Sequence, residues 1–172
     1  MVHQLRTSLL VGAAALLATV CVRAETIDRV LAVVANQLIT LSDVTAAIDL
    51  GLQSPDEAAD PKRAVLSKLI DRELILAEVD RYAPAEPTAE AVDREIARVR
   101  QRFASPAAFE TALARSGIDE KHLRETLRQD LRMREYLDQR FSVADRRVRM
   151  VDEWLAGLRR RGGVVDLYLA GR

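Results

Sequence analysis

The chain has 172 residues, of which 26 are lysine or arginine and 26 are aspartate or glutamate, so its formal net charge is zero. A balanced charge provides no long-range attraction to a polyanion, and we therefore expect no nucleic-acid partner. One cysteine and two histidines also leave little material for disulfides or for a metal site, so neither is expected.

The N-terminal residues are typical of a secretory signal peptide. A polar start with Arg6 is followed by an uncharged apolar run over residues 8–20 and by a sequence that resembles a cleavage site over residues 22–24. The run is shorter than the roughly 20 residues that a membrane-spanning helix needs; retention as an uncleaved anchor is the alternative. We predict a signal peptide over residues 1–24 and a mature, exported domain over residues 25–172 without a stable membrane span.

The first element of the mature chain is predicted to be a β-hairpin. Residues 30–35 form a short, valine-rich apolar run, which is typical of a buried strand. Asn36 and Gln37 are expected to form the turn, because asparagine tolerates a positive φ angle. Residues 38–40 would then return as a second strand.

Two helices should follow the hairpin. Thr40 and Asp43 have the spacing of a capping box, with Ser42 as the competing N-cap, and this predicts a short helix that ends at about Leu50. Asp60 precedes Pro61 and is expected to cap a longer helix, which must end before the prolines within residues 84–87. This longer helix has a broad apolar face, so we place it at the centre of the core.

Four more helices are predicted in the second half of the chain. Thr88 begins the first, Ser105 caps a shorter second, and Asp119 caps a long third that ends near Phe141. The last helix is expected over residues 144–161.

The C-terminal stretch GGVVDLYLAGR, residues 162–172, breaks the helical pattern. Two glycines stop the last helix, and a β-branched and aromatic run follows. A strand cannot leave its backbone groups buried and unpaired without a large cost. The hairpin within residues 29–40 is the only predicted partner. The sequence therefore indicates a mainly α fold, an irregular multi-helix body with a small antiparallel sheet formed by the N-terminal hairpin and the C-terminal strand.

No residue pattern predicts catalysis. His122 is the single histidine of the mature chain, and it lacks a positioned acid or base partner in the sequence. Arginines cluster within residues 146–149 and 159–161, but acidic residues dilute the first cluster and the second suits the C-terminal turn of a helix. We therefore interpret both clusters as solvated helix surface, and we expect no catalytic residue and no cofactor.

Three stretches together resemble the N-terminal domain of SurA-type periplasmic chaperones. The first is IDRVLAVVANQLITLSDVTAAI, residues 27–48, which is similar to the hairpin and first helix of that family. The second is LSKLIDRELILAEVDRY, residues 66–82, which is similar to its apolar second helix. The third is FASPAAFETALARSGIDEKHLRETLRQDLRMREYLDQRF, residues 103–141. The resemblance covers about residues 25–141.

The chain departs from that family after Phe141. Full-length SurA-like proteins carry one or two parvulin isomerase domains at this point, whereas this chain continues directly into DRRVRMVDEWLAGLRRRGGVVDLYL, residues 145–169. That stretch is similar to the C-terminal helix and strand of the family, which pack on its N-terminal domain. The resemblance thus implies a chaperone domain, here over residues 25–172 including a C-terminal helix and strand over 144–172, that lacks the isomerase domains.

The resemblance implies an ATP-independent periplasmic holdase for unfolded outer-membrane or secreted polypeptides. Precursors of outer-membrane β-barrels would be its clients, and no activity as an enzyme is expected. Two alternatives stay open: a protein related to peptidyl-prolyl cis-trans isomerases, and a subunit or scaffold that acts with a separate isomerase. The sequence leaves the oligomeric state open.

A client-binding groove would need apolar side chains between the helices. Met133 lies off the leucine stripe of its helix, which favours exposure, whereas Phe103, Phe109 and Leu113 lie on regular stripes and are better explained as core. The full set of predicted peptide-binding residues is Phe103, Phe109, Leu113, Met133, Phe141 and Met150.

Overall fold

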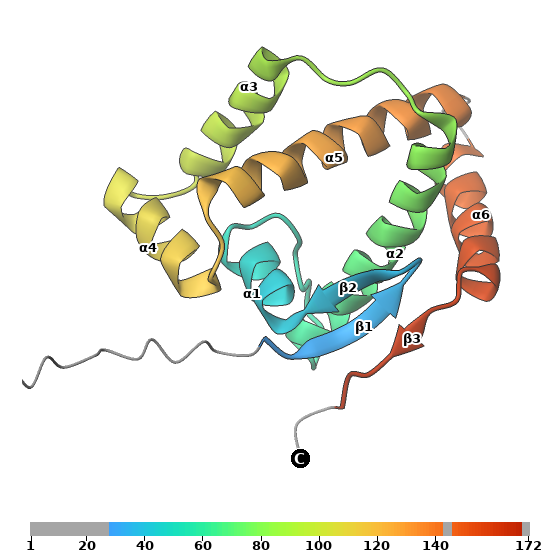
Figure 1. Ribbon diagram of the computed structural model, residues 1–172, viewed down its shortest axis with the longest axis horizontal. Helices are drawn as coiled ribbons and strands as arrows, with labels where there is room; N and C mark the ends of the chain where they lie inside the picture. The colour runs from blue at the N-terminus through green and yellow to red at the C-terminus, as the bar shows by residue number, and fades with distance from the viewer. Residues whose placement is uncertain (1–27, 143–145, 170–172) are drawn as a thin grey trace, which may run out of the picture.

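The structure is a computed structural model that describes residues 28–142 and 146–169. A three-stranded antiparallel sheet packs against a helical body, as Figure 1 shows. The predicted mainly α fold with a small terminal sheet is confirmed. The described elements are β1 (Val30–Val34), β2 (Gln37–Thr40), α1 (Leu41–Asp49), α2 (Pro61–Tyr82), α3 (Ala89–Arg100), α4 (Pro106–Ser116), α5 (Glu120–Arg140), α6 (Arg147–Arg161) and β3 (Val165–Asp166).

The hairpin turn lies one residue earlier than predicted. Ala35 and Asn36 form it, with φ angles of 49° and 67°, so the prediction of Asn36 and Gln37 was wrong. A two-residue turn matches the twist of its strands when both of its residues have positive φ. A positive φ angle is strained for alanine, but the pairing of Val34 with Gln37 leaves Ala35 and Asn36 as the two turn residues and so requires this conformation.

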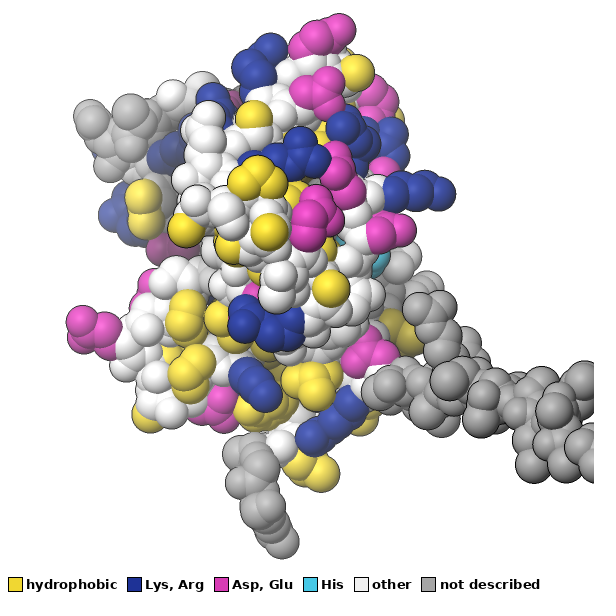
Figure 2. Space-filling view, turned by 90° about the vertical axis from the view of Figure 1, so that its left-hand side faces the viewer, with side chains coloured by type: hydrophobic (Ala, Val, Ile, Leu, Met, Phe, Trp, Pro, Cys, Tyr) yellow, Lys and Arg dark blue, Asp and Glu magenta, His cyan; other side chains and the backbone are white. Residues whose placement is uncertain are grey.

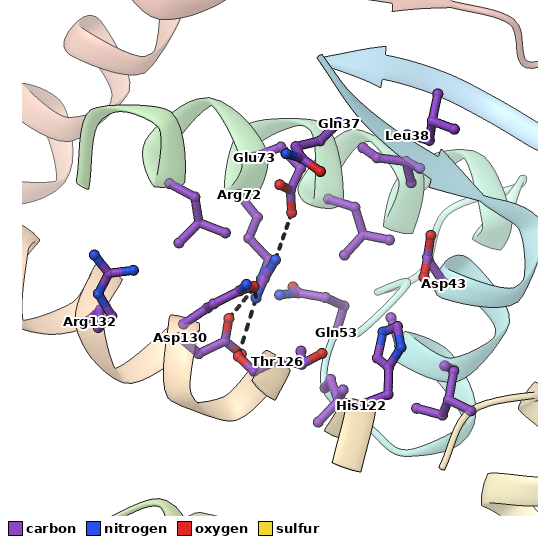
Figure 3. Close-up of a pocket in the computed structure, with 18 of the residues that line it drawn as sticks. Gln37, Leu38, Asp43, Gln53, Arg72, Glu73, His122, Thr126, Asp130 and Arg132 are labelled. Carbon is purple, nitrogen blue, oxygen red and sulfur yellow. Dashed lines mark hydrogen bonds and ion pairs between the residues drawn. The ribbon is translucent and has the colours of Figure 1, made fainter. Parts of the chain in front are cut away.

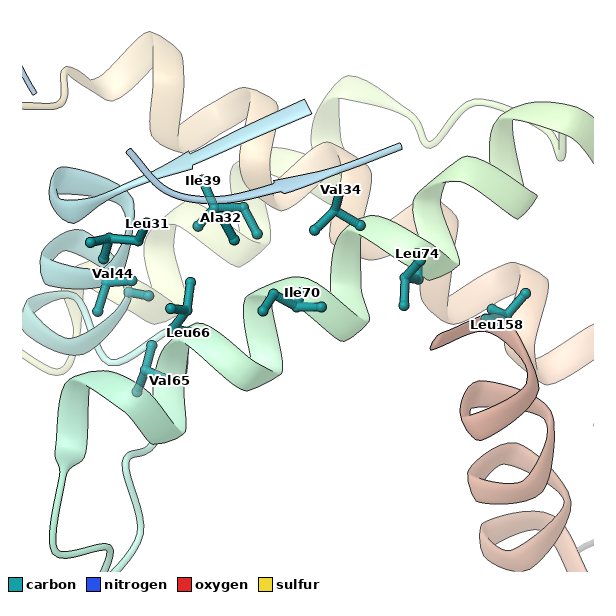
Figure 4. Close-up of a cluster of buried hydrophobic side chains, with 11 residues drawn as sticks. Leu31, Ala32, Val34, Ile39, Val44, Val65, Leu66, Ile70, Leu74 and Leu158 are labelled. Atoms are coloured by element: carbon teal, nitrogen blue, oxygen red, sulfur yellow. The ribbon is translucent and has the colours of Figure 1, made fainter. Parts of the chain in front are cut away.

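A bulge at the start of the hairpin increases the apolar surface that the sheet buries. The register shifts between Val30 and Ala32, which leaves Leu31 as an extra residue opposite β2. Adjacent residues of a regular strand point to opposite faces. Here Leu31 and Ala32 are both fully buried in the same core, and Val34 joins them over α2 (Figure 4).

Local capping signals set the helix boundaries as predicted. Thr40 and Asp43 form the reciprocal capping box of α1. The side chains of Asp60, Thr88 and Asp119 accept hydrogen bonds from the first turns of α2, α3 and α5. Each bond satisfies a backbone donor that the helix itself cannot pair.

The body has two main cores that share one helix. The first core lies between the sheet, α1, α2 and α6, and its largest fully buried side chains include Leu31 and Leu66. The second lies between α1, α3, α4 and α5 around Phe109 and Leu123. Because α1 contributes Val44 to the first core and Ala46 to the second, it connects the two.

The C-terminal strand pairs with the N-terminal hairpin, which confirms the predicted pairing. The sheet order is β2-β1-β3, and Ala32 and Val33 of β1 pair with Asp166 and Val165 of β3. The hydroxyl of Tyr168 donates to the carboxylate of Asp60 at 2.9 Å, which attaches the end of the chain to the start of α2. The described part of α6 begins at Arg147; residues 144 and 145, predicted to begin it, lie outside the described residues.

The helices that the structure describes include none that is long and apolar enough to cross a membrane. The predicted signal peptide, residues 1–24, lies outside the described residues.

Candidate functional site

A cleft lies beyond the free edge of the sheet, between β2 and α5. Its volume is about 320 Å³, and α1, α2 and the loops that contain Leu52 and Ile118 supply its remaining walls (Figure 3). The residues Gln37, Leu38 and Ile39 of β2 line it, whereas no residue of β1 or β3 does. Since β2 is an outer strand of the sheet, the cleft occupies the side where a further strand would lie. Apolar side chains on its other walls include Leu52, Leu69, Leu76 and Ile118.

Arg72 joins two walls of the cleft. Its guanidinium group is buried; Nε donates to Asp130 Oδ1 at 2.7 Å and Nη1 donates to Glu73 Oε1 at 2.6 Å. Its Nη2 donates to Gln129 Oε1 at 3.0 Å and to the Thr126 carbonyl oxygen at 3.2 Å. Arg72 lies on α2, whereas Thr126, Gln129 and Asp130 lie on α5. The arginine therefore holds the two helices at the spacing that keeps the cleft between them.

Glu73 is the titratable group of the cleft whose pKa is displaced upward. Burial disfavours its charged form and raises its pKa above the ordinary value. Arg72 acts in the opposite direction, while the nearby carboxylates of Asp43 and Asp130 raise the pKa further. A further negative charge is thus unfavourable at this position.

The lining of the cleft has an excess of acidic groups. Asp43, Glu73, Asp80 and Asp130 line it together with Arg72 and Arg132, which makes four carboxylates against two guanidinium groups. Both arginines are already ion-paired, Arg72 as described and Arg132 with Asp80 at 3.0 Å. Arg132 Nε lies 3.1 Å from Glu86 Oε1 without the alignment of a hydrogen bond. Neither arginine neutralises Asp43.

A second hollow lies between α3 and α5, on the far side of α5 from β2. It has a volume of about 820 Å³ and apolar lining from Pro87, Ala89 and Val92. Lys121, Arg124 and Arg128 of α5 also line it. His122 lines both hollows, at the N-terminal end of α5.

An aromatic cluster joins the ends of α2 and α5 to α6. The guanidinium carbon of Arg140 lies 5.3 Å from the ring centre of Trp154 and 5.6 Å from that of Phe141, within the range of cation–π contacts. Tyr82 and Tyr136 complete the cluster around it. The buried Tyr136 hydroxyl has no hydrogen-bond partner among the described residues, and burial raises the pKa of this phenol.

The six predicted peptide-binding residues do not line one groove. Phe109 and Leu113 are buried in the second core, and Phe103 packs against that core with its ring 5.5 Å from that of Phe109. Phe141 is buried in the aromatic cluster beside Trp154. Met133 packs, half-buried, against Ile75, Val79 and Tyr136. Met150, on α6, is the exposed member of the set.

Sequence reasoning overlooked the cleft and its arginine. Arg72 is separated by 58 residues from Asp130, so no local spacing indicates their contact. The available signal was an arginine among the apolar positions of α2, the helix that the sequence places at the centre of the core. A charged group in that position must find a partner on another element.

Exposed apolar side chains gather on the outer face of the sheet. Leu38 and Val165 are 59% and 51% exposed, and both pair in register with Val33, so the three share one face. Leu167 and Leu169 continue the exposed apolar run after β3. On the face that Figure 2 shows, hydrophobic side chains form small groups among interspersed acidic and basic ones.

Among the described residues, no group of three histidine, cysteine, aspartate or glutamate side chains could hold a metal ion. The described elements all belong to the helical body and its sheet, and none of them forms a parvulin domain.

Comparison with known families agrees with this architecture. No curated protein matches the chain at a significant level. The family model of the SurA-like N-terminal domain matches residues 9–137, which is most of the chain and includes the hairpin and helices α1 to α4 with nearly all of α5. The chain therefore belongs to the SurA-like N-terminal domain family.

Proposed function

We propose that this protein is an ATP-independent chaperone that holds unfolded polypeptides and prevents their aggregation. The observation that carries the proposal is the open cleft between β2 and α5 in a chain of the SurA-like N-terminal domain family. A holdase must bind many sequences weakly and reversibly. A surface hollow with main-chain groups, amide side chains and apolar walls suits that task, because such groups recognise any extended backbone.

The proposal includes export and client class. The charge-free apolar run over residues 8–20 supports removal of a signal peptide and residence in the periplasm. In that compartment the abundant unfolded chains are precursors of outer-membrane β-barrels, which we propose as clients.

Suppression of aggregation tests the chaperone activity. An outer-membrane β-barrel protein is diluted from urea into buffer without nucleotide, and light scattering is followed with and without the purified protein. We expect scattering to fall in proportion to added protein. Unchanged scattering at stoichiometric excess would show that the proposed activity is absent.

Two further measurements separate this proposal from its alternatives. A proline-peptide isomerisation assay should show no rate above background, since a rate above it would favour the isomerase alternative. N-terminal sequencing of the protein recovered from the periplasmic fraction should begin at Glu25. Recovery in the membrane fraction with Met1 retained would instead support an uncleaved anchor.

A further inference from the structure

We propose that the cleft binds an extended, positively charged polypeptide segment that pairs as an added strand with the free edge of β2 at Leu38. The inference rests on the proposed chaperone function and specifies how that function recognises its clients.

The backbone geometry of the hairpin leaves one set of hydrogen-bonding groups available. In a hairpin with a two-residue turn, the residues that flank the turn exchange both of their hydrogen bonds, and such pairs alternate along the ladder. Val34 and Gln37 are that pair, so Leu38, one residue further, turns its N–H and C=O away from β1. The other edge of β1 is consistent with this alternation. There the Leu31 carbonyl oxygen points toward β3 and accepts from the N–H of Leu167 at 2.9 Å.

The rest of this edge is already closed. The N–H of Thr40 donates to Asp43 Oδ2 at 2.8 Å within the capping box. Gln37 and Ile39 direct their backbone groups to β1. Leu38 is therefore the position of β2 where a further strand can pair, and Leu38 lines the cleft.

The outer edge of β3 is a poorer acceptor for a strand. The N–H of Tyr168 donates to Asp166 Oδ1 at 3.0 Å, and Arg63 forms an ion pair with the same aspartate. Side chains thus occupy this edge, which is how proteins commonly protect an edge strand. The two edges of the sheet differ in that β2 lines the cleft described above, whereas no residue of β3 does.

The walls of the cleft suit an extended chain. Gln37 and Gln53 line it, and an amide side chain both donates to and accepts from a peptide group. Its volume of about 320 Å³ is at the lower end of the roughly 300–1,000 Å³ typical of ligand sites. It admits a short extended segment rather than a folded element.

Charge selects the segment that binds. The four carboxylates of the lining exceed its two guanidinium groups, and both guanidinium groups already have partners. Burial is the main cause of the raised pKa of Glu73, and the negative charges of Asp43 and Asp130 beside it raise that pKa further. A lysine or arginine side chain in the cleft would relieve that excess, whereas an acidic side chain would add to it.

Labelled synthetic peptides test the proposal by fluorescence anisotropy. The reference peptide alternates threonine and valine around one central lysine, and a matched peptide has glutamate in place of the lysine. Two further peptides carry N-methyl groups on alternate amides, one in each of the two alternating sets. We expect the glutamate peptide and one N-methylated peptide to bind about tenfold more weakly than the reference, and the other N-methylated peptide to keep its affinity.

The two N-methylated peptides are decisive because they leave the protein unchanged. A strand that pairs along one edge uses only every second N–H, so the two peptides must differ. Equal binding of both, or no binding of the reference peptide, would overturn strand pairing. Equal binding of the lysine and glutamate peptides would overturn the charge preference.

Protein variants locate the site. Leu38→Pro removes the available N–H without breaking a bond to β1. A strand tolerates proline at such a position, where the N–H points away from its partner strand. Leu38→Ala keeps the N–H and serves as the matched control. We expect the proline variant to lose about tenfold in affinity for the reference peptide and the alanine variant to retain it. Thermal melting of both variants establishes that they are folded.

The same variants separate this inference from the proposed function. Full suppression of aggregation by Leu38→Pro would leave the chaperone activity intact and would show that strand pairing at β2 is wrong. Absence of suppression by the wild-type protein would instead refute the chaperone activity itself.

Discussion

At the scale of single residues, the cleft depends on buried charge. Arg72 has little exposed surface, and its partners Glu73 and Asp130 are 18% and 22% exposed. Removing one partner of a buried ion pair leaves the other charge buried without compensation. The stability lost in this way is larger than the net stability that the intact pair contributes. The network is thus a constraint on the spacing of α2 and α5 rather than a large source of stability.

The raised pKa of Glu73 predicts a pH-dependent effect of Glu73→Gln. The folded protein binds the Glu73 proton more tightly than the unfolded chain, whose ordinary value is 4.5. The contribution of Glu73 to stability is therefore fully present below pH 4.5 and is lost as the pH rises through the raised pKa. We therefore expect the free energy of unfolding of Glu73→Gln, relative to that of the wild type, to be higher at pH 7 than at pH 4.

Urea denaturation at a series of pH values measures this difference. Glu110→Gln, on the exposed surface of α4, is the control and should follow the wild type at each pH. A difference between Glu73→Gln and the wild type that is the same at both ends of the series would contradict the prediction.

At the scale of elements, the junction of α6 with β3 depends on one close approach. A Cβ atom at Gly162 would collide with Leu74 Cδ2 of α2 and lie 2.8 Å from the Leu158 carbonyl oxygen. The φ angle of Gly162 is −83°, which every residue type adopts, so space rather than backbone conformation requires glycine here. The end of α6 therefore lies directly on α2.

A pair of glycine substitutions tests that contact. Gly162→Ala should destabilise the protein by about 1–3 kcal/mol, because the added methyl group overpacks the contact with Leu74. Gly157→Ala lies within α6, where its Cβ would meet only flexible arginine side chains, with Arg161 Nη1 at 3.1 Å. It should stabilise the protein by about 0.5–1 kcal/mol, since alanine is the better helix former. Thermal melting of both variants measures the difference, and equal melting temperatures would refute the close contact.

At the scale of the whole molecule, α1 couples the two main cores. Val44 and Ala47 pack toward the sheet, while Ala46 and Leu50 pack toward Phe109 and its neighbours. Neither core is separable without exposing one face of α1. We therefore expect the domain to unfold as one cooperative unit.

The single tryptophan reports on this coupling. Trp154 packs against the first core and the aromatic cluster, whereas Phe109 lies in the second core and is 1% exposed. Phe109→Ala should cost about 3–5 kcal/mol because it leaves a large cavity. The midpoint of unfolding should move to the same lower denaturant concentration whether it is followed by tryptophan fluorescence or by circular dichroism. Val148 is exposed, so Val148→Ala should leave both midpoints unchanged. A shift in circular dichroism alone would show that the two cores unfold independently.

Much of the fold could be predicted from the sequence because its signals are local. The caps at Thr40, Asp60, Thr88 and Asp119 act within one helical turn, so residue identity and spacing suffice to place them. The turn was predicted one residue too late because the pairing of Val34 with Gln37 places Ala35 in the turn, although alanine disfavours the positive φ angle found there. The candidate site could not be predicted in this way, since its residues come from β2, α1, α2 and α5.

The sequence by itself determined the order of the elements and most of their boundaries, because capping, proline placement and apolar periodicity are properties of neighbouring residues. The family was indicated separately, by the resemblance of three stretches of the chain to known members. Only the tertiary structure decided which side chains are accessible. It buried Phe109 and Leu113, for which sequence analysis had favoured a place in the core, it buried Phe141 as well, and it brought Arg72 to Asp130 across the cleft. Burial and ion pairing join residues far apart in the chain, so they are set by how the elements pack and not by any one segment.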